Sequence, residues 1–221
     1  MNNVANIRES FYELYRNNEF VTDKSDVKTI ELVGASFIAD ENTIFGNMNT
    51  DYAKREIDWY SSGSLFVDDI PGKTPEIWKQ VSSKNGEINS NYGWCVFSSE
   101  NWDQFGSVLE TLKSHRDSRR AIMIYTRPKM QVDYCRDGMS DFICTNTVQY
   151  LIRDHVLNVI VQMRSNDAVF GYKNDLYWQQ HVASLLCKEL NCLGYKIHWQ
   201  VGSLHLYERH FPLMKEYFEY E

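Results

Sequence analysis

Residues 141–175 read DFICTNTVQYLIRDHVLNVIVQMRSNDAVFGYKND, and this stretch decides the fold. It contains two runs with strand character, separated by the short polar break RDH at 153–155. Cys144 lies near the start of the first run, and the second run ends in the polar cluster Arg164, Ser165, Asn166 and Asp167. A thiol, a guanidinium, a hydroxyl and a carboxylate are therefore expected at the ends of two neighbouring strands. This combination indicates a nucleotide-binding active site with a cysteine nucleophile.

The size and charge of the chain limit the number of domains and the kinds of ligand that are expected. It has 221 residues and a mass of 26.0 kDa, which predicts a single domain over residues 1–221. Hydrophobic residues make up 43% of the chain, enough to bury a core of ordinary size. The net charge of −7 disfavours direct nucleic-acid binding, because a duplex needs many Lys and Arg side chains facing its phosphates. A small anion held by a few local arginines is compatible with this charge.

The cysteines favour a reducing compartment. There are five, an odd number, and no pair has the CxxC spacing, so neither a disulfide framework nor a zinc site is expected. The first residues, MNNVANIRES, lack the apolar core of a signal peptide. No apolar run reaches the roughly 20 residues that a membrane helix needs. These features predict a cytoplasmic protein without a bound metal or a membrane anchor.

The rest of the chain alternates between helical and extended patterns. Apolar spacing predicts a short helix from Pro75 and longer ones at residues 4–17, 50–61, 101–114 and 174–190. Strands are expected at residues 28–37, 121–126 and 203–207. Residues 86–97, GEINSNYGWCVF, are expected to form a turn followed by a strand.

Several polar residues have both a structural and a functional interpretation. Asp175 or its neighbour Asn174 is placed to cap the last helix, and Asp175 is also a candidate site carboxylate. Arg119 and Arg120 are a solvated loop pair or a phosphate clamp, the latter if the following strand starts after them. His205 shares a strand face with Tyr207, so the two rings contact a ligand or lie in the core.

Short motifs spread over nearly the whole chain resemble the thymidylate synthase family. The matching pieces, in order, are REIDWY, NYGW, DSRR, the cysteine in ICT, MRSNDAVFG and GSLHLY. Within that family, GEINSNYGW, DGMSDF and CTNTVQYLIRD are similar to the bacteriophage branch that hydroxymethylates deoxycytidylate. Two departures from ordinary members favour that branch. Ile143-Cys144-Thr145 stands where those members have Pro-Cys-His, and Asp175 stands where they have an asparagine.

The resemblance implies an α+β fold, in which helices flank a large mixed β-sheet and one sheet face packs in a homodimer. It implies a single thymidylate synthase-like catalytic domain over residues 1–221. The implied reaction converts dCMP, water and 5,10-methylenetetrahydrofolate to 5-hydroxymethyl-dCMP and tetrahydrofolate, for modified phage DNA precursors. It also implies the cytoplasm of a host cell as the location, and association with other nucleotide-synthesis enzymes.

The resemblance further assigns roles to single residues. The implied catalytic residues are Cys144, Glu56, Tyr92 and Asp175, of which Glu56 orders water near the base and Tyr92 assists removal of the C5 proton. The implied dCMP-binding residues are Lys24, Arg119, Arg120, Arg164, Ser165, Asp175, His205 and Tyr207. Arg119 and Arg120 are expected to reach the site of the partner subunit, which makes the homodimer obligate. The folate side is lined by Asp167 and Gly171.

The proposed chemistry explains why a cysteine and an acid are needed. C5 of a pyrimidine is a poor nucleophile, and a Cys144 thiolate that adds at C6 makes C5 reactive towards a one-carbon unit. Arg164 is expected to help keep this thiol ionised and to hold phosphate. An ionised Asp175 only accepts hydrogen bonds, which suits N4 and a protonated N3 of cytosine but opposes O4 of uracil. The alternatives are a thymidylate synthase or dUMP hydroxymethylase, and a nucleotide-binding subunit without turnover.

Overall fold

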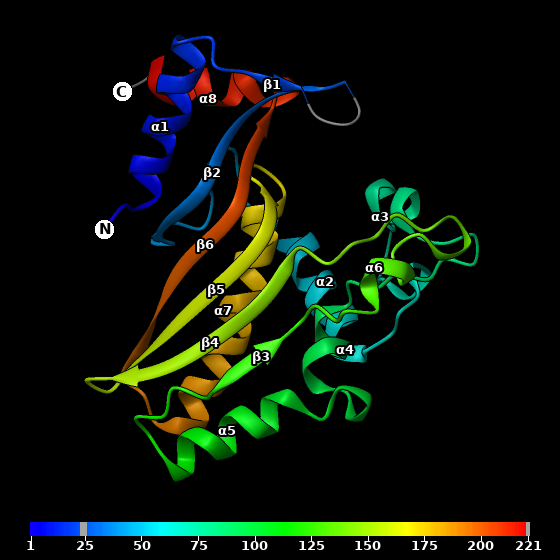
Figure 1. The fold of residues 1–221 in the computed structure, drawn as a ribbon, viewed down its shortest axis with the longest axis vertical. Coiled ribbons are helices and arrows are strands. Elements are labelled where there is room, and N and C mark those ends of the chain that lie inside the picture. Colours follow the sequence, from blue (N-terminus) through cyan, green and yellow to red (C-terminus); the bar gives the residue numbers. More distant parts are fainter. Residues whose placement is uncertain (23–25, 220–221) are drawn as a thin grey trace.

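A six-stranded mixed β-sheet forms the centre of the computed structural model, which describes residues 1–22 and 26–219 (Figure 1). Its order is β1-β2-β6-β5-β4-β3, in which β5 and β6 are parallel and every other neighbouring pair is antiparallel. The strands are β1 (Val21–Thr22), β2 (Lys28–Ile38), β3 (Ile122–Ile124), β4 (Thr145–Arg153), β5 (Val156–Asp167) and β6 (Gly194–Tyr207). The expected α+β class with a mixed sheet is confirmed.

The β4–β5 hairpin sets the register on which the site depends. Its two turn residues, Asp154 and His155, have positive φ angles of 50° and 62°, as the tight primed hairpin turns require. Arg153 then pairs with Val156, and the pairing continues to the far end of the hairpin. There the backbone N–H of Arg164 donates to the carbonyl of Cys144 at 2.9 Å. The two strand runs of the sequence thus bring the cysteine and the arginine side by side, as expected.

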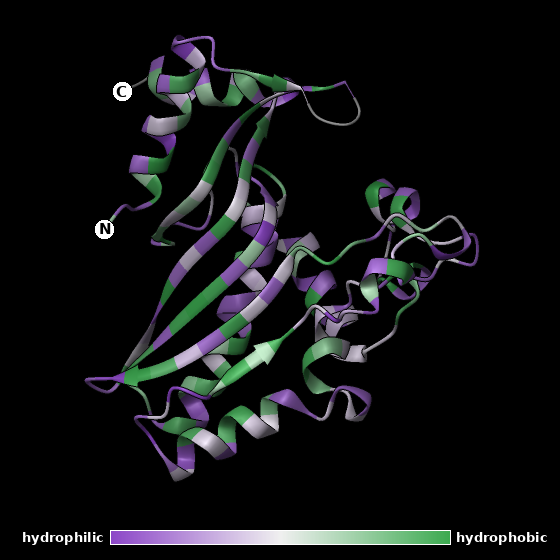
Figure 2. Ribbon diagram, in the orientation of Figure 1, coloured by the Kyte–Doolittle hydropathy of each residue, from purple (hydrophilic) through white to green (hydrophobic). Residues whose placement is uncertain are grey.

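Helix α7 (Gly171–Leu190) connects β5 to β6 and covers one face of the sheet (Figure 1). The β5 side chains Leu157, Val159 and Val161 are fully buried on this side, as are Val182 and Leu186 of the helix. Each such burial stabilises the fold by about 1.5–3 kcal/mol. The hydrophobic alternation of the strands is visible in Figure 2.

The opposite face of the sheet carries a row of polar side chains. Thr147 donates to Gln162 at 2.7 Å, and Gln162 donates to Gln200 at 3.2 Å, so the row crosses three strands. Within the part of the chain that the structure describes, no helix lies over the middle of this face (Figure 1).

The remaining helices form two groups at the ends of the sheet (Figure 1). Helices α1 (Val4–Arg16) and α8 (Phe211–Glu219) pack together, with the rings of Tyr12 and Phe218 stacked at 4.3 Å. The second group is a helical lobe of α2 (Thr50–Ser62), α3 (Glu76–Val81), α4 (Tyr92–Phe97), α5 (Gln104–Ser114) and α6 (Met130–Asp133). Short 3-10 turns occur at Val67–Asp69, Ser99–Asn101, Arg136–Gly138 and Glu208–His210. In the described ranges, no helix has the length and apolarity to cross a membrane.

Residues 86–97 do not contain the expected strand. A helix, α4, begins at Tyr92, because the side chain of Asn91 caps it by accepting from the Trp94 N–H at 2.7 Å. The helix lies against α2 so closely that a Cβ on Gly93 would be 1.8 Å from the carbonyl oxygen of Tyr60. A short apolar run such as WCVF fits a strand or a helix equally well, and here the cap and the tertiary contact decide.

The interpretation of Asp175 as a helix cap is also wrong. Helix α7 begins at Gly171, so Asp175 lies inside the helix. Its side chain accepts a hydrogen bond from Asn166 Nδ2 at 2.7 Å, and Asn166 belongs to β5. The role of this carboxylate therefore has to come from the site that it faces.

Candidate active site

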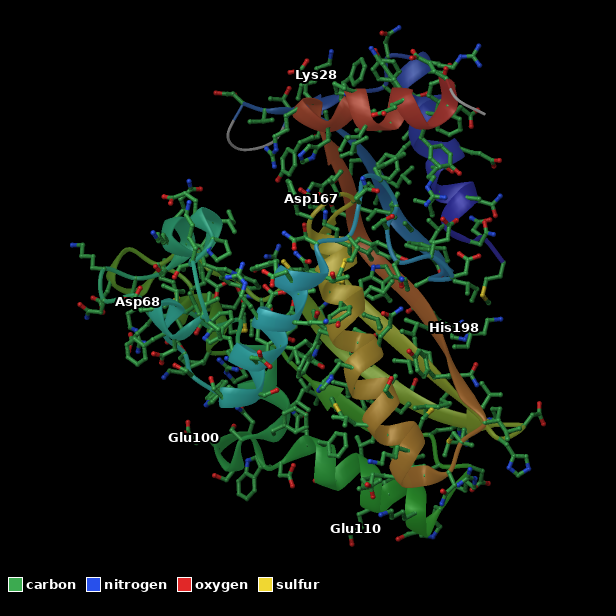
Figure 3. The ribbon with its side chains drawn as sticks, turned by 180° about the vertical axis from the view of Figure 1, so that it is seen from behind. Lys28, Asp68, Glu100, Glu110, Asp167 and His198 are labelled. Atoms are coloured by element: carbon green, nitrogen blue, oxygen red, sulfur yellow. The ribbon has the colours of Figure 1, made fainter. Side chains whose placement is uncertain are left out.

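A cavity of about 930 Å³ separates the helical lobe from the end of the sheet. This volume is typical of a pocket for one or two small molecules. The first turn of α7 with the preceding Asp167 forms one side, and Asp68 lies in the lobe across from it (Figure 3). The cavity brings together these predicted site residues: Glu56, Tyr92, Cys144, Arg164, Asp167, Gly171, Asp175 and Tyr207.

Cys144 and Arg164 form the sheet side of the cavity. The Arg164 guanidinium donates to the carbonyls of Ile143 at 3.0 Å and Phe142 at 2.6 Å, and its Nη2 lies 3.6 Å from Cys144 Sγ. Burial nevertheless raises the pKa of Cys144 to about 12, with Arg164 lowering it and Asp175 and Asp141 raising it. Burial thus has a larger effect than Arg164 on the pKa of this thiol.

Two carboxyl groups, the buried Glu56 and the half-buried Asp175, approach the cavity from α2 and α7. Burial raises the pKa of Glu56 to about 7, against the lowering effect of a hydrogen bond from Tyr52. Burial and the nearby Glu56 raise the pKa of Asp175 to about 7, against the lowering effect of Asn166. Both groups therefore change protonation close to neutral pH, as general acids and bases do.

Because Gly171 has no side chain, it leaves room for the hydrogen bond between Asn166 and Asp175. A Cβ at Gly171 would lie 2.9 Å from Asn166 Nδ2, which is too close for an ordinary side chain. Asp167 organises the same turn, because its Oδ1 accepts from the backbone N–H groups of Val169 at 2.6 Å and Phe170 at 2.9 Å. Asp167 and Gly171 thus shape the entry into α7 as well as lining the cavity.

The remaining predicted ligand-binding residues lie around the site or far from it. The rings of His205 and Tyr207 meet edge to face at 5.0 Å, as expected for one strand face, and Tyr207 lines the cavity. Ser165 pairs with Ser203 of β6 at the end of the sheet and does not line the cavity, and neither does His205. Lys24 falls outside the described residues.

Arg119 and Arg120 do not reach the cavity of their own chain. Both are exposed on the loop that leads from α5 to β3. Ile122, just beyond them, pairs with Gln149, which is five residues along β4 from Cys144. At about 3.4 Å per strand residue, this places the arginines on the order of 17 Å from the thiol.

The structure adds site residues that the sequence did not single out. Tyr52 donates to Glu56 and accepts from Trp78 Nε1 at 2.9 Å, so two hydrogen bonds through Tyr52 connect the Glu56 carboxyl to α3. The spacing of four residues between Tyr52 and Glu56 on one helix face was a usable signal. Asp141 accepts from the backbone N–H groups of Asn89 and Ser90 and fastens the segment before α4 next to Cys144. No local pattern in the sequence indicates that contact.

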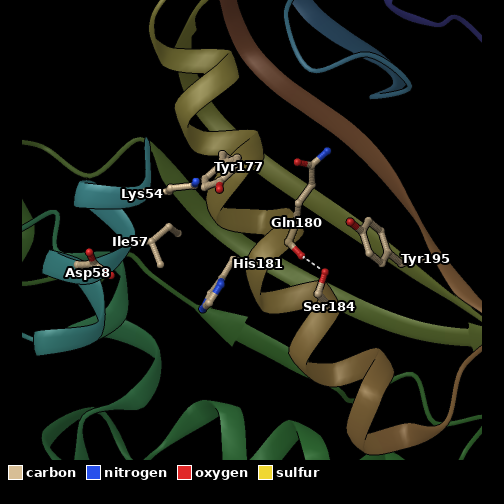
Figure 4. A pocket seen from close by; sticks show the side chains of 8 residues that line it. All are labelled: Lys54, Ile57, Asp58, Tyr177, Gln180, His181, Ser184 and Tyr195. Atoms are coloured by element: carbon tan, nitrogen blue, oxygen red, sulfur yellow. Dashed lines mark hydrogen bonds between the residues drawn. The ribbon is translucent and has the colours of Figure 1, made fainter. Parts of the chain in front are cut away.

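A second, smaller hollow of about 350 Å³ lies between the outer sides of α2 and α7 (Figure 4). It contains Lys54, Ile57, Asp58, Tyr177, Gln180, His181, Ser184 and Tyr195. None of these is a predicted site residue, so the larger cavity is the candidate active site. No cluster of three or more His, Cys, Asp or Glu side chains in the described ranges is arranged to hold a metal ion.

The family model for thymidylate synthase matches residues 11–221 of the chain. The chain belongs to the thymidylate synthase family. It is 56% identical over 223 residues to deoxycytidylate 5-hydroxymethyltransferase of Enterobacteria phage T4, covering 98% of this chain and 91% of that protein. It is 57% identical over 218 residues to the phage T2 protein of the same name, covering 96% and 89%. By contrast, a thymidylate synthase of Francisella philomiragia is 25% identical over 171 residues, 73% of this chain and 62% of its own length.

Members of the thymidylate synthase family use methylenetetrahydrofolate, and the cavity has surface suited to such a molecule. Ile77 and Phe170 both line it, and they are 59% and 52% exposed. Exposed apolar side chains that line a cavity are typical of a ligand-binding surface.

Proposed function

We propose that the chain is a deoxycytidylate 5-hydroxymethyltransferase. It converts dCMP, water and 5,10-methylenetetrahydrofolate to 5-hydroxymethyl-dCMP and tetrahydrofolate. The observation that carries this assignment is the half-buried carboxyl of Asp175, which lines the same cavity as Cys144 and accepts a hydrogen bond from Asn166 at 2.7 Å. The high identity to two phage proteins of that name supports it.

In the proposed mechanism, Cys144 Sγ adds to C6 of the pyrimidine and makes C5 nucleophilic. C5 bonds to the one-carbon unit that the folate supplies, and tetrahydrofolate leaves after the C5 proton has been removed. Tyr92, which is buried against Tyr60 and Tyr125, assists removal of the C5 proton. Water completes the product at the exocyclic carbon, and the thiolate leaves C6. Glu56, whose pKa is raised to about 7, is placed to order this water and to exchange a proton with it.

Asp175 is proposed to select cytosine. With its pKa raised to about 7, the carboxyl can arrive protonated, donate to N3 of cytosine and accept from the N4 amino group. The same proton can move to N3 when the thiolate attacks C6, and the ionised carboxylate then pairs with the N3–H and with N4. The carboxyl of Asp175 is thus proposed to bind dCMP in its protonated form, rather than always ionised as the sequence alone suggested, because burial favours that form.

The phosphate of dCMP is proposed to bind where two subunits meet. Arg164 comes from the cavity of one chain, with Ser165 next to it at the end of β5 and Lys24, while Arg119 and Arg120 come from the partner across the uncovered face of the sheet. Two observations support sharing: the two arginines lie far from their own cavity, and that sheet face has no helical cover within the described residues. Added positive charge from the partner would also oppose the burial that raises the pKa of Cys144 to about 12.

Release of tritium from [5-³H]dCMP tests the assignment. We expect release that depends on methylenetetrahydrofolate and is at least about 100-fold faster than from [5-³H]dUMP, because of the polar complementarity of Asp175 to cytosine. The product should carry a hydroxymethyl group by mass spectrometry. Faster release from dUMP would indicate a thymidylate synthase or dUMP hydroxymethylase, a methylated product would indicate hydride transfer, and no release would indicate a binding subunit.

Hybrid dimers test the shared phosphate site. A Cys144→Ser chain and an Arg119→Ala/Arg120→Ala chain should each be inactive as homodimers. In a hybrid of the two, the chain that retains Cys144 receives intact arginines from its partner, so one site works. We expect about half of the wild-type activity per hybrid dimer, measured by tritium release, since one of two sites is restored. Hybrids as inactive as the parents would contradict arginine donation between subunits.

The relatives in phages T4 and T2 support a role in making modified phage DNA precursors in the cytoplasm of an infected cell. Association with other enzymes of nucleotide synthesis fits that role. The acidic charge of −7 disfavours direct binding to the DNA itself.

A further inference from the structure

The loop that carries Arg119 and Arg120 has a fixed backbone but free arginine side chains. The N–H of Arg120 donates to Ser118 Oγ at 3.2 Å, and Gln149 of β4 donates to the carbonyl of Arg119 at 2.9 Å. By contrast, neither arginine side chain makes a hydrogen bond or ion pair within residues 1–22 and 26–219. A loop held in this way presents two cations to something outside its own chain.

Arg116 connects this loop to the end of α7. Its Nη1 donates to the carbonyl of Leu190, the last residue of α7, at 2.8 Å, and its Nη2 lies 3.8 Å from Cys192 Sγ. The α7 end is closed by Asn191, which is left-handed with a φ of 51°, and the Cys192 N–H donates to the carbonyl of Cys187 at 3.0 Å. The partial negative charge of a helix C-terminus favours a cation there. Arg116 therefore has a fixed, chemically complementary anchor.

We propose that Arg116 is a positioning residue for the phosphate site of the partner subunit. Its bond to Leu190 holds the loop of residues 115–120 in the conformation that presents Arg119 and Arg120. Arg116 does not touch the substrate itself, and it acts on the other subunit's site rather than on its own. This inference rests on the proposed function, because it needs the two arginines to serve a phosphate across the interface.

Loss of the anchor should weaken dCMP binding with little effect on the chemical step. If the loop of an Arg116→Ala chain keeps the presenting conformation in about one tenth of the molecules, the apparent affinity for dCMP falls about tenfold. We therefore expect KM for dCMP to rise about tenfold and kcat to change less than about twofold. Arg116→Lys should stay within about threefold of the wild-type KM, because an ammonium can still donate to the Leu190 carbonyl.

Lys113 provides a matched control. Its Nζ lies 3.5 Å from Glu189 Oε2, so it also joins the end of α5 to the end of α7, but it lies before the arginine loop and both side chains of the pair are about half exposed. Lys113→Ala removes a cation of the same region without releasing the Leu190 contact. We expect its KM for dCMP to equal that of the wild type within about twofold, as exposed ion pairs contribute little.

Hybrid dimers distinguish positioning from general destabilisation. In the first hybrid, one chain carries Cys144→Ser together with Arg116→Ala and the other is wild type, so the working site receives its arginines from the altered loop. In the second, Cys144→Ser and Arg116→Ala are on different chains, so the working site lies in the Arg116→Ala chain but receives arginines from an intact loop. A hybrid of Cys144→Ser with wild type is the reference for both.

We expect the raised KM only in the first hybrid. Equal KM values in the two hybrids, or a tenfold increase only in the second, would overturn the inference. The same two hybrids, made with Arg119→Ala/Arg120→Ala in place of Arg116→Ala, test separately whether the arginines act across the interface. If those arginines act across the interface and Arg116 does not, the positioning role alone is wrong. If the wild-type enzyme does not release tritium from dCMP, the proposed function fails first.

Discussion

Replacing Cys144 with serine is expected to reduce turnover of dCMP by at least about 10⁴-fold, because a serine hydroxyl is a far weaker nucleophile than a thiolate. The variant should still bind dCMP, since Arg164 donates mainly to the carbonyls of Phe142 and Ile143 and keeps its place without the sulfur. Tritium release measures the first effect and equilibrium dialysis the second. A normal dCMP affinity with no release would assign the sulfur to the chemical step.

Cys135→Ser is the matched control for this experiment. Cys135 is exposed and lies outside the cavity, so the change from sulfur to oxygen there should leave turnover within about twofold of the wild type. A Cys144→Ser enzyme that retained more than about 1% of the wild-type rate would contradict the covalent mechanism. With methylenetetrahydrofolate present, the wild-type enzyme should also form a mass adduct with 5-fluoro-dCMP, because a fluorine at C5 cannot be removed as the C5 proton is and the covalent adduct cannot proceed.

Replacing Asp175 with asparagine is expected to invert the choice of base. The amide complements the N3–H and O4 of uracil, whereas its fixed NH₂ group and single carbonyl cannot supply the mobile proton that cytosine needs at N3. We expect kcat/KM for dCMP to fall about 10³- to 10⁴-fold and that for dUMP to rise above it, measured by tritium release. Asp58→Asn, which removes an exposed carboxylate from the hollow behind α2, should change neither value.

The pH dependence of binding tests the same role of Asp175. Because its pKa is raised to about 7, the carboxyl carries the required proton below this pH and loses it above. Binding of dCMP to the Cys144→Ser enzyme should therefore weaken about tenfold per pH unit above pH 7, and a Cys144→Ser/Asp175→Asn enzyme should lose this dependence. If Asp175→Asn changed neither the base preference nor the pH profile, Asp175 would have only a structural role, as the acceptor of the hydrogen bond from Asn166.

The elements with long, regular patterns were predicted well from the sequence. The β4–β5 hairpin follows from two apolar runs and a two-residue turn, and its register places Cys144 opposite Arg164 without information from the rest of the chain. Short or ambiguous runs were predicted poorly. Residues 92–97 form a helix because Asn91 caps it and Gly93 lets it approach α2, and the second cause depends on a contact with another segment.

By itself, the sequence determined the family and the identity of the reactive groups, because motifs such as MRSNDAVFG and GSLHLY are local and specific. Only the tertiary structure decided how those groups behave. Burial, which no local pattern reports, raises the pKa of Asp175 to about 7 and of Cys144 to about 12. The start of α7 at Gly171 excludes the alternative of Asp175 as a helix cap, and the tertiary structure places its carboxyl at the cavity. The distance of Arg119 and Arg120 from their own Cys144 likewise depends on strand register, which joins residues far apart in the chain.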